Sequence, residues 1–259
     1  MVEAKDLSLE ERRQQILKNV DENGRVSVAE LSSKLGVSGV TIRNDLQALA
    51  DQKLIIRTHG GAISNNSGLY ELALAMRRQK RVQEKDRIGQ ACAGMIANSE
   101  AIILDSSSTA LATVQHLKDR RQLTIVTNSL AVAQELRDAP GVSVVMPGGK
   151  FQPETNSITG TGGLGLLRRF NLQKGFFGAH GITLEEGLTD VSLEEAEIKR
   201  ELAAMCRQKI AVVDASKWGQ IGLASFAQIQ DFDIVITDKQ APVELVDQVR
   251  QLGIEVIDV

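Results

Sequence analysis

The sequence predicts an α/β fold in two parts, a small helical domain followed by a larger domain built on a parallel β-sheet. Two observations carry this prediction. Short helical patterns with capping signals fill the first 64 residues, and aliphatic strand-like runs alternate with helical patterns over the rest. The chain has 259 residues, 42% of them hydrophobic, which is enough for a sizeable core. We therefore expect domains at 1–64 and 87–259, joined by a linker at 65–86.

Two capping boxes mark helix starts in the first domain. The Ser-Leu-Glu-Glu motif at 8–11 predicts a helix whose apolar face includes Leu9 and Ile16. The Ser-Val-Ala-Glu motif at 27–30 predicts a second helix, which Gly36 closes.

A third helix is predicted to begin almost at once, because only Gly36-Val37 separates the second helix from the capping residue Ser38. This spacing is that of a helix-turn-helix. The third helix carries an apolar stripe of Ile42, Leu46 and Leu49. Residues able to hydrogen-bond bases or phosphates occupy the rest of its surface: Thr41, Arg43, Asn44 and Gln47, beside Ser38. This face is either the DNA-reading surface of a recognition helix or an ordinary solvated helix face.

Two short strands around a Gly-Gly turn are predicted at 54–63, directly after the third helix. A hairpin in this position is a wing. Arg57 and His59 would lie on it, where they are suited to contact backbone phosphate or the minor groove. The hairpin favours DNA binding, and the first domain is predicted to be a winged helix-turn-helix.

Polar loops follow the predicted strands of the second domain. The strand at 101–105 leads into the hydroxyl-rich loop 106–109, and later strands end at Asn128-Ser129 and at Ala215-Ser216-Lys217. In open parallel sheets, ligands bind beyond the carboxyl ends of the strands. The loop at 106–109 is either an anion site, with backbone N–H groups facing a ligand, or a simple helix cap.

A long motif runs through the whole first domain. Its parts are Ser27-Val28-x-Glu30-Leu31, Leu35-Gly36-Val37-Ser38, Thr41-Ile42-Arg43-x-Asp45-Leu46, Leu49, Leu54 and Arg57-x-His59-Gly60-Gly61-Ala62. This motif resembles that of the DeoR/GlpR family of bacterial sugar-responsive transcription regulators. The family usually has a second arginine where this chain has Asn44, a difference that concerns the operator sequence rather than DNA binding.

The resemblance continues to the C-terminus. The matching stretches are Leu104-Asp105-Ser106-Ser107-Ser108-Thr109, Thr127-Asn128-Ser129, Gly148-Gly149, Gly187-Leu188-Thr189-Asp190, Glu195-Ala196-x-x-Lys199 and Asp214-x-Ser216-Lys217-x-Gly219. They look like the family's effector domain, which is similar to ribose-5-phosphate isomerases. The resemblance implies that the loop at 106–109 holds the effector phosphate. It also implies a site lined by Asp105, Asn128, Ser129, Gly148, Gly149, Asp190, Lys199 and Lys217.

The resemblance implies a repressor of carbohydrate uptake and catabolism genes. It would bind double-stranded operator DNA as a homo-oligomer, dimer or tetramer, and a phosphorylated sugar would release it. An isomerase-like enzyme is one alternative, but the segment 175–181, which corresponds to the isomerases' acidic catalytic segment, has no carboxylate. A scaffold that has lost DNA binding is another. We expect no catalytic residues, no cofactor and no metal.

The composition also bears on the location of the protein, its cysteines and its charge. No apolar run approaches the roughly 20 residues that span a bilayer, and no secretory leader is predicted, so we expect a cytoplasmic protein without membrane contact. Cys92 and Cys206 match no metal or redox spacing and are expected to be buried free thiols. The net charge is −3, but residues 1–64 carry nine Lys/Arg and nine Asp/Glu. A neutral DNA-binding domain predicts modest non-specific affinity, and hence a dependence on oligomerisation and base contacts.

Overall fold

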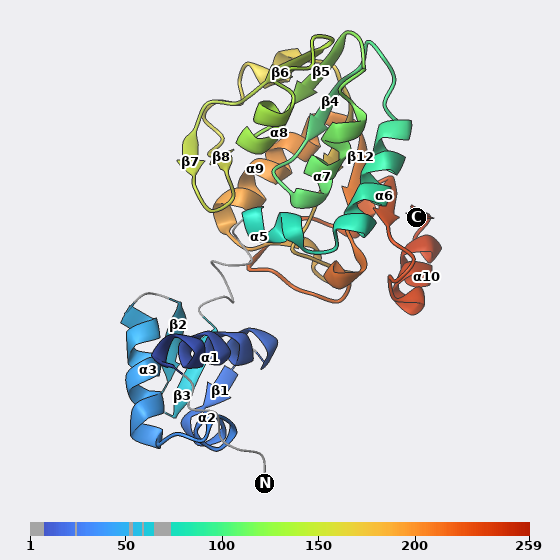
Figure 1. Ribbon diagram of the computed structural model, residues 1–259. Helices are drawn as coiled ribbons and strands as arrows, with labels where there is room; N and C mark the ends of the chain where they lie inside the picture. Colours follow the sequence, from blue (N-terminus) through green and yellow to red (C-terminus); the bar gives the residue numbers. More distant parts are fainter. Residues whose placement is uncertain (1–7, 24, 52–53, 59, 65–73) are drawn as a thin grey trace. The chain divides into compact units, whose positions relative to one another are not determined.

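The computed structural model describes residues 8–23, 25–51, 54–58, 60–64 and 74–259 (Figure 1). The chain separates into two compact units, Met1–Glu71 and Leu72–Val259.

Within its described residues, the first unit has three helices and a three-stranded antiparallel sheet of strand order β1-β3-β2. Its elements are α1 (Leu9–Asn23), β1 (Arg25–Ser27), α2 (Val28–Leu35), α3 (Gly39–Asp51), β2 (Ile55–Thr58) and β3 (Gly61–Ser64). The predicted winged helix-turn-helix is confirmed, with β1 as an additional strand. Leu9 was expected on the buried face of α1 but is 54% exposed, because it begins the first turn while the core starts at Ile16.

Local hydrogen bonds explain the boundaries of α2. The Ser27 hydroxyl accepts from the Glu30 N–H at 3.1 Å and the Glu30 carboxylate accepts from the Ser27 N–H at 3.0 Å, which confirms the predicted capping box. Gly36 ends the helix with φ of 67°, a conformation that favours glycine. Gly61 lets β3 approach β1, because a Cβ there would lie 1.9 Å from the Val26 carbonyl oxygen.

The second unit is built on a seven-stranded parallel sheet of order β15-β14-β12-β9-β4-β5-β6. The strands are β4 (Ala101–Leu104), β5 (Leu123–Val126), β6 (Val142–Val145), β9 (Leu172–Phe177), β12 (Cys206–Val212), β14 (Ile234–Thr237) and β15 (Glu255–Asp258). This confirms the parallel-sheet prediction. Alternate residues of a strand enter two different cores, as Ile102 and Ile103 of β4 do, so the sheet is covered on both faces.

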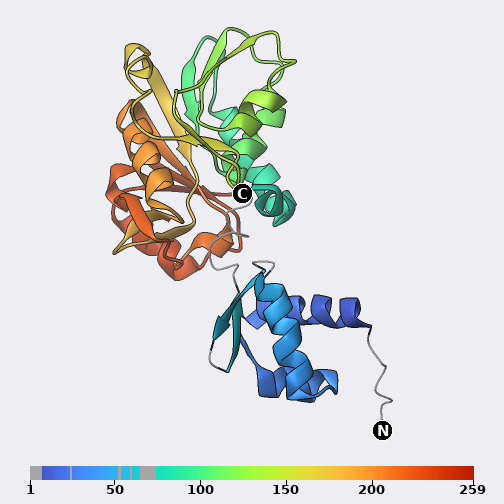
Figure 2. The ribbon, with the colours of Figure 1, turned by 90° about the vertical axis from the view of Figure 1, so that its left-hand side faces the viewer.

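Helices cover both faces of this sheet (Figure 2). Their bounds are α5 (Leu74–Gln79), α6 (Val82–Gly94), α7 (Ser108–Thr113), α8 (Leu130–Glu135), α9 (Leu193–Ala204) and α10 (Val243–Gln251), with short 3-10 turns at Val114–His116, Leu167–Arg169, Ala215–Lys217 and Ile229–Asp231. Buried residues of α5 to α8 share one core, and those of α9 and α10 share the other. Residues 74–86, expected to belong to the linker, are therefore largely helical and pack within the second unit.

Two small antiparallel sheets complete the second unit, and neither was predicted. One consists of β10 (Gly181–Thr183), β11 (Gly187–Asp190) and β13 (Ala224–Ala227), and the other is the hairpin of β7 (Lys150–Gln152) and β8 (Ser157–Thr159). Cys92 and Cys206 are buried free thiols, as predicted, and burial raises the pKa of each to about 12. Among the described helices, none is long and apolar enough to cross a membrane.

Candidate DNA-binding surface and effector site

The helix α3 has two distinct faces. Its apolar stripe of Ile42, Leu46 and Leu49 is buried in the core of the first unit, as predicted. The predicted DNA-contacting residues lie outside this core, exposed except for the half-buried Thr41: Ser38, Thr41, Arg43, Asn44 and Gln47. Ser38 also caps the helix, because its hydroxyl accepts from the Thr41 N–H at 3.1 Å.

Asp45 lies on the buried face of α3, and the sequence analysis gave it no role. Its carboxylate accepts from Arg12 Nε at 2.6 Å and from Arg13 Nε at 3.0 Å, so it ties α3 to α1. The signal was present in the sequence, because position 45 lies three residues after Ile42 and four before Leu49, within the apolar stripe. A carboxylate in such a stripe is buried and requires a partner.

Val40 is a second residue that the sequence analysis missed. Its side chain is 63% exposed, directly beside the polar face of α3. Apolar side chains at this end of a recognition helix can contact the thymine methyl group. Of the two predicted wing residues, Arg57 lies in β2 but its side chain is not described, and His59 lies outside the described residues.

Three predicted effector residues form a buried ion-pair cluster at the carboxyl edge of the parallel sheet. The Lys199 amine lies 2.9 Å from Asp105 and 2.6 Å from Asp190, and it donates to the Gly178 carbonyl at 2.9 Å. Although burial opposes the charge of Lys199, the two carboxylates raise its pKa above the ordinary value. Burial likewise raises the pKa of Asp190, but Lys199 outweighs it and holds that pKa below the ordinary value. The three donors of Lys199 are thus all used within the protein.

A second buried group extends this cluster through hydroxyls. Ser106 donates to one Glu195 carboxylate oxygen at 2.9 Å, and Ser157 donates to the other at 2.5 Å. Thr155 hydrogen-bonds Ser157 at 2.7 Å. Glu195 precedes Lys199 by one helical turn, so their spacing could have indicated a shared face of α9. Thr155 and Ser157 lie in the unpredicted β7–β8 hairpin and carried no sequence signal.

The two predicted polar loops use several of their groups as helix caps. The Ser107 hydroxyl accepts from Ala110 N–H at 3.1 Å and the Ser129 hydroxyl from Val132 N–H at 3.3 Å, so capping is part of their role. Ser108 and Thr109 are buried in the first turn of α7. Asn128 is fully buried, and its amide donates to the Ile158 carbonyl at 3.2 Å. Within the described residues, the Asn128 side-chain oxygen accepts no hydrogen bond.

The remaining predicted residues lie at the margins of this edge. Gly148 and Gly149 are exposed, and a Cβ on Gly149 would lie 2.2 Å from the Thr159 carbonyl oxygen, so this turn needs glycine for packing. Lys217 ends the 3-10 turn that follows β12 and is half-buried.

The junction of α5 and α6 contributes residues that were not assigned to the site. Arg81 adopts φ of 52°, unusual for a residue with a side chain, and pairs with Asp238 at 2.9 Å and Asp214 at 3.3 Å. These two carboxylates follow β14 and β12, so Arg81 fastens the junction to the carboxyl edge of the sheet. The basic run at 77–81 was the available sequence signal.

Comparisons with known proteins agree with this arrangement. The model of the DeoR-like helix-turn-helix domain matches residues 12–68, and that of the DeoR C-terminal sensor domain matches residues 80–239. The HTH-type transcriptional regulator GolR of Listeria innocua is 36% identical, covering 95% of this chain and 97% of its own. The HTH-type transcriptional repressor GlcR of Bacillus subtilis is 31% identical, covering 96% of this chain and 95% of its own. The glycerol-3-phosphate regulon repressor of Escherichia coli is 32% identical, covering 91% of this chain and 93% of its own.

Among solved structures, a ribose-5-phosphate isomerase solved with phospho-erythronic acid aligns with this chain at a TM-score of 0.40 and 12% identity, covering 53% of this chain and 54% of the isomerase. The three sequence relatives match this chain over nearly their whole length, and all three are named as transcription regulators or repressors. This favours the regulator over the isomerase-like alternative. With its winged helix-turn-helix and its sensor domain both matched, the chain belongs to the DeoR family of DNA-binding transcription regulators.

Proposed function

We propose that the protein is a repressor of carbohydrate genes that reads its operator with α3 and is released by a phosphorylated sugar. The exposed polar face of α3, opposite its buried stripe, carries the DNA-reading part of this proposal. Arg43 and Asn44 suit bidentate contacts with guanine and adenine, and Val40 suits a thymine methyl group. The contacting set is Ser38, Val40, Thr41, Arg43, Asn44 and Gln47, with Arg57 and His59 on the wing.

Arg43→Ala tests the DNA-reading face. We expect it to weaken operator binding by about 1–3 kcal/mol at fixed salt. Fluorescence anisotropy measures this with DNA from the promoter of the operon that neighbours the gene. Arg168→Ala is the matched control, because it removes an exposed arginine from the second unit. Equal affinities of both variants and the wild type would exclude this role for α3.

The effector part of the proposal rests on the Asn128 side-chain oxygen. Buried acceptors are nearly always satisfied, so an acceptor at the carboxyl edge of a parallel sheet suits a donor from a ligand. A sugar hydroxyl is such a donor. The loop at 106–109 and Ser129 would line the same site, with Lys217 at its margin. The buried ion pairs of Asp105, Asp190 and Lys199 would stabilise the site, and Gly148 and Gly149 would shape the neighbouring turn.

A thermal-shift panel tests the effector class. It compares glycerol 3-phosphate, ribose 5-phosphate, glucose 6-phosphate, fructose 1-phosphate and fructose 6-phosphate with their unphosphorylated counterparts, because a ligand of the native state raises apparent stability. We expect a phosphorylated compound to stabilise the wild type and Asn98→Ala, but not Asn128→Ala. Asn98 is an exposed asparagine elsewhere in the unit and serves as the control. Stabilisation by unphosphorylated sugars alone would refute the phosphorylated effector.

A homo-oligomer is part of the proposal, because two copies related by two-fold symmetry match a palindromic operator and double the contacts of one winged unit. Light scattering of the free protein and of its operator complex measures the number of copies. A monomer on a single half-site would refute this part.

A further inference from the structure

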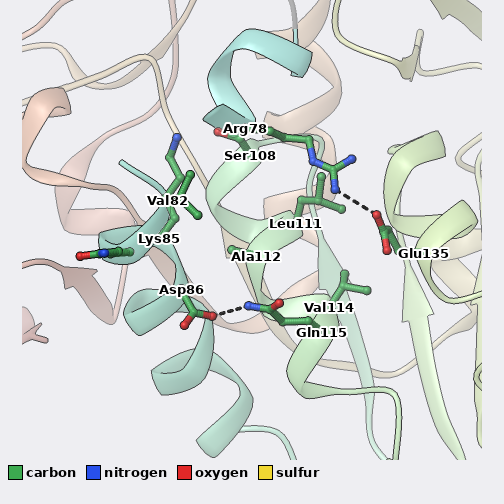
Figure 3. Close-up of a pocket in the computed structure, with 11 residues that line it drawn as sticks. Arg78, Val82, Lys85, Asp86, Ser108, Leu111, Ala112, Val114, Gln115 and Glu135 are labelled. Carbon is green, nitrogen blue, oxygen red and sulfur yellow. Dashed lines mark hydrogen bonds and ion pairs between the residues drawn. The ribbon is translucent and has the colours of Figure 1, made fainter. Parts of the chain in front are cut away.

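A cavity of about 430 Å³ lies between the α5–α6 segment and α7 (Figure 3). It is lined by Arg78, Val82, Gln83, Lys85, Asp86, Ser108, Leu111, Ala112, Val114, Gln115 and Glu135. Of the predicted effector residues it includes only Ser108. Four of its polar side chains pair with one another, since Arg78 donates to Glu135 at 2.9 Å and Gln115 donates to Asp86.

Lys85 differs from the other charged groups of the cavity. Its side chain is buried, and its amine donates to the carbonyls of Arg77 at 2.6 Å and Lys80 at 2.8 Å. An ammonium group has three donors, so one remains after these two bonds. Among the residues that the structure describes, no carboxylate forms an ion pair with Lys85. It is therefore a buried cation without a direct counter-charge, which is costly unless an anion arrives.

The electrostatic surroundings agree with this geometry. The pKa of Lys85 is lowered to about 8, chiefly by burial; Asp214 opposes this shift, and the charges of Lys217, Arg77 and Arg81 add to it. Lys199, in contrast, uses its three donors to bind Asp105, Asp190 and the Gly178 carbonyl.

We propose that Lys85 binds the anionic group of the effector in this cavity, with the Ser108 hydroxyl as a second donor. The proposal rests on the phosphorylated effector proposed above and assigns the residue that receives its charge. Because Lys85 also donates to the Arg77 carbonyl in α5 and to the Lys80 carbonyl just after it, the bound anion would act on the segment that connects the sensor unit to the DNA-binding unit. Ligand binding and the conformation of α5 are then linked through one side chain.

Lys85→Met in the full-length protein tests the assignment. The probe is the sugar phosphate that gives the largest shift in the panel, together with inorganic phosphate alone. We expect Lys85→Met to bind the sugar phosphate at least ten-fold more weakly and to lose the preference for it over the unphosphorylated sugar. Lys80→Met is the control, because it removes an exposed charge from the same segment and keeps the backbone carbonyl that Lys85 contacts. Its affinity should equal that of the wild type.

A measurement on the wild type covers the case in which Lys85→Met disturbs α5. A phosphate monoester has its second pKa near 6, so its charge is constant above about pH 7.5. The anion favours the protonated amine, so affinity should fall as the pH rises through about 8, by nearly ten-fold per unit beyond that. An affinity that is constant from pH 7.5 to pH 9.5, or equal binding by Lys85→Met and the wild type, would overturn the assignment while leaving the proposed effector intact. If neither the sugar phosphates nor inorganic phosphate stabilise the wild type, both proposals fail.

Discussion

Lys199→Met removes the one cation of the buried cluster at the carboxyl edge of the sheet. The Lys199 side chain is 3% exposed and stands between Asp105 and Asp190, which are 0% and 10% exposed. Removing one partner of a buried ion pair costs about 3–5 kcal/mol, because the other charges stay desolvated. Two carboxylates remain here, but one can take up a proton and limit the repulsion. We therefore expect a loss of about 3–5 kcal/mol of unfolding free energy at pH 7.

Urea unfolding followed by tryptophan fluorescence measures this loss. Trp218 is the only tryptophan of the chain, is buried in the same unit and donates to Thr237 at 3.0 Å, so its emission reports the sensor unit. Lys118→Met is the matched control, since Lys118 is 49% exposed and lies 3.7 Å from Glu135. Such a surface pair contributes at most about 1 kcal/mol. A loss for Lys199→Met as small as that of the control would show that the cluster is not desolvated.

The pH dependence of the unfolding free energy tests independently whether these charges cause the loss of stability. In the wild type the pKa of Asp190 is lowered, so its contribution to stability is present above the ordinary value of 3.8 and is lost as the pH falls through the lowered value. Lys199→Met removes the charge that lowers this pKa. The difference between wild type and variant should therefore narrow under acid. A difference that stays constant from pH 7 to pH 3 would contradict the assignment of the effect to these charges.

Three further predictions concern other parts of the chain. Asp45→Asn removes the charge that pairs with Arg12 and Arg13, and it should lower the stability of the first unit by about 1–3 kcal/mol; the loss is limited because both arginines are partly solvated. Hydrogen exchange should rise in α1 and α3 and stay unchanged in the sheet of the second unit. Gly61→Ala should cost about 1–3 kcal/mol, because its Cβ would meet the Val26 carbonyl, and unchanged exchange in β1 and β3 would refute this. Cys92 and Cys206 should resist thiol reagents at pH 8 until the protein unfolds, whereas immediate labelling would contradict their burial.

The parts of the fold that were predicted depend on neighbours in the sequence. Capping boxes and the apolar spacing of α3 operate over three to seven residues, so they can be read directly from the chain. The strand β1 was missed because it is three residues long and its partners lie far along the chain, with Arg25 opposite Ile63. The β7–β8 hairpin was missed for a related reason, since short polar strands lack the aliphatic pattern that identifies the central sheet.

The candidate site shows the same division between local and distant information. The positions of Asp105 and Asn128 at strand ends follow from the alternation of strands and helices. Which charges meet there does not, because Asp105, Asp190 and Lys199 come from three separate elements. Lys199 was expected to supply positive charge to an effector, and only the folded arrangement shows that two carboxylates and a carbonyl occupy its donors.

This arrangement has a consequence for how a ligand could be sensed. The cluster behind the predicted phosphate loop holds more carboxylates than cations, since Glu195 lies beside Asp105, Asp190 and Lys199. An anionic ligand at this edge therefore needs cations from outside the cluster. In the described chain, the nearby candidates include the α5–α6 junction, where Lys85 lies buried. A ligand shifts a conformational equilibrium only through interactions that differ between the two states. A neutral sugar could occupy the edge without engaging this junction, whereas a phosphorylated one would act on the segment that leads to the DNA-binding unit.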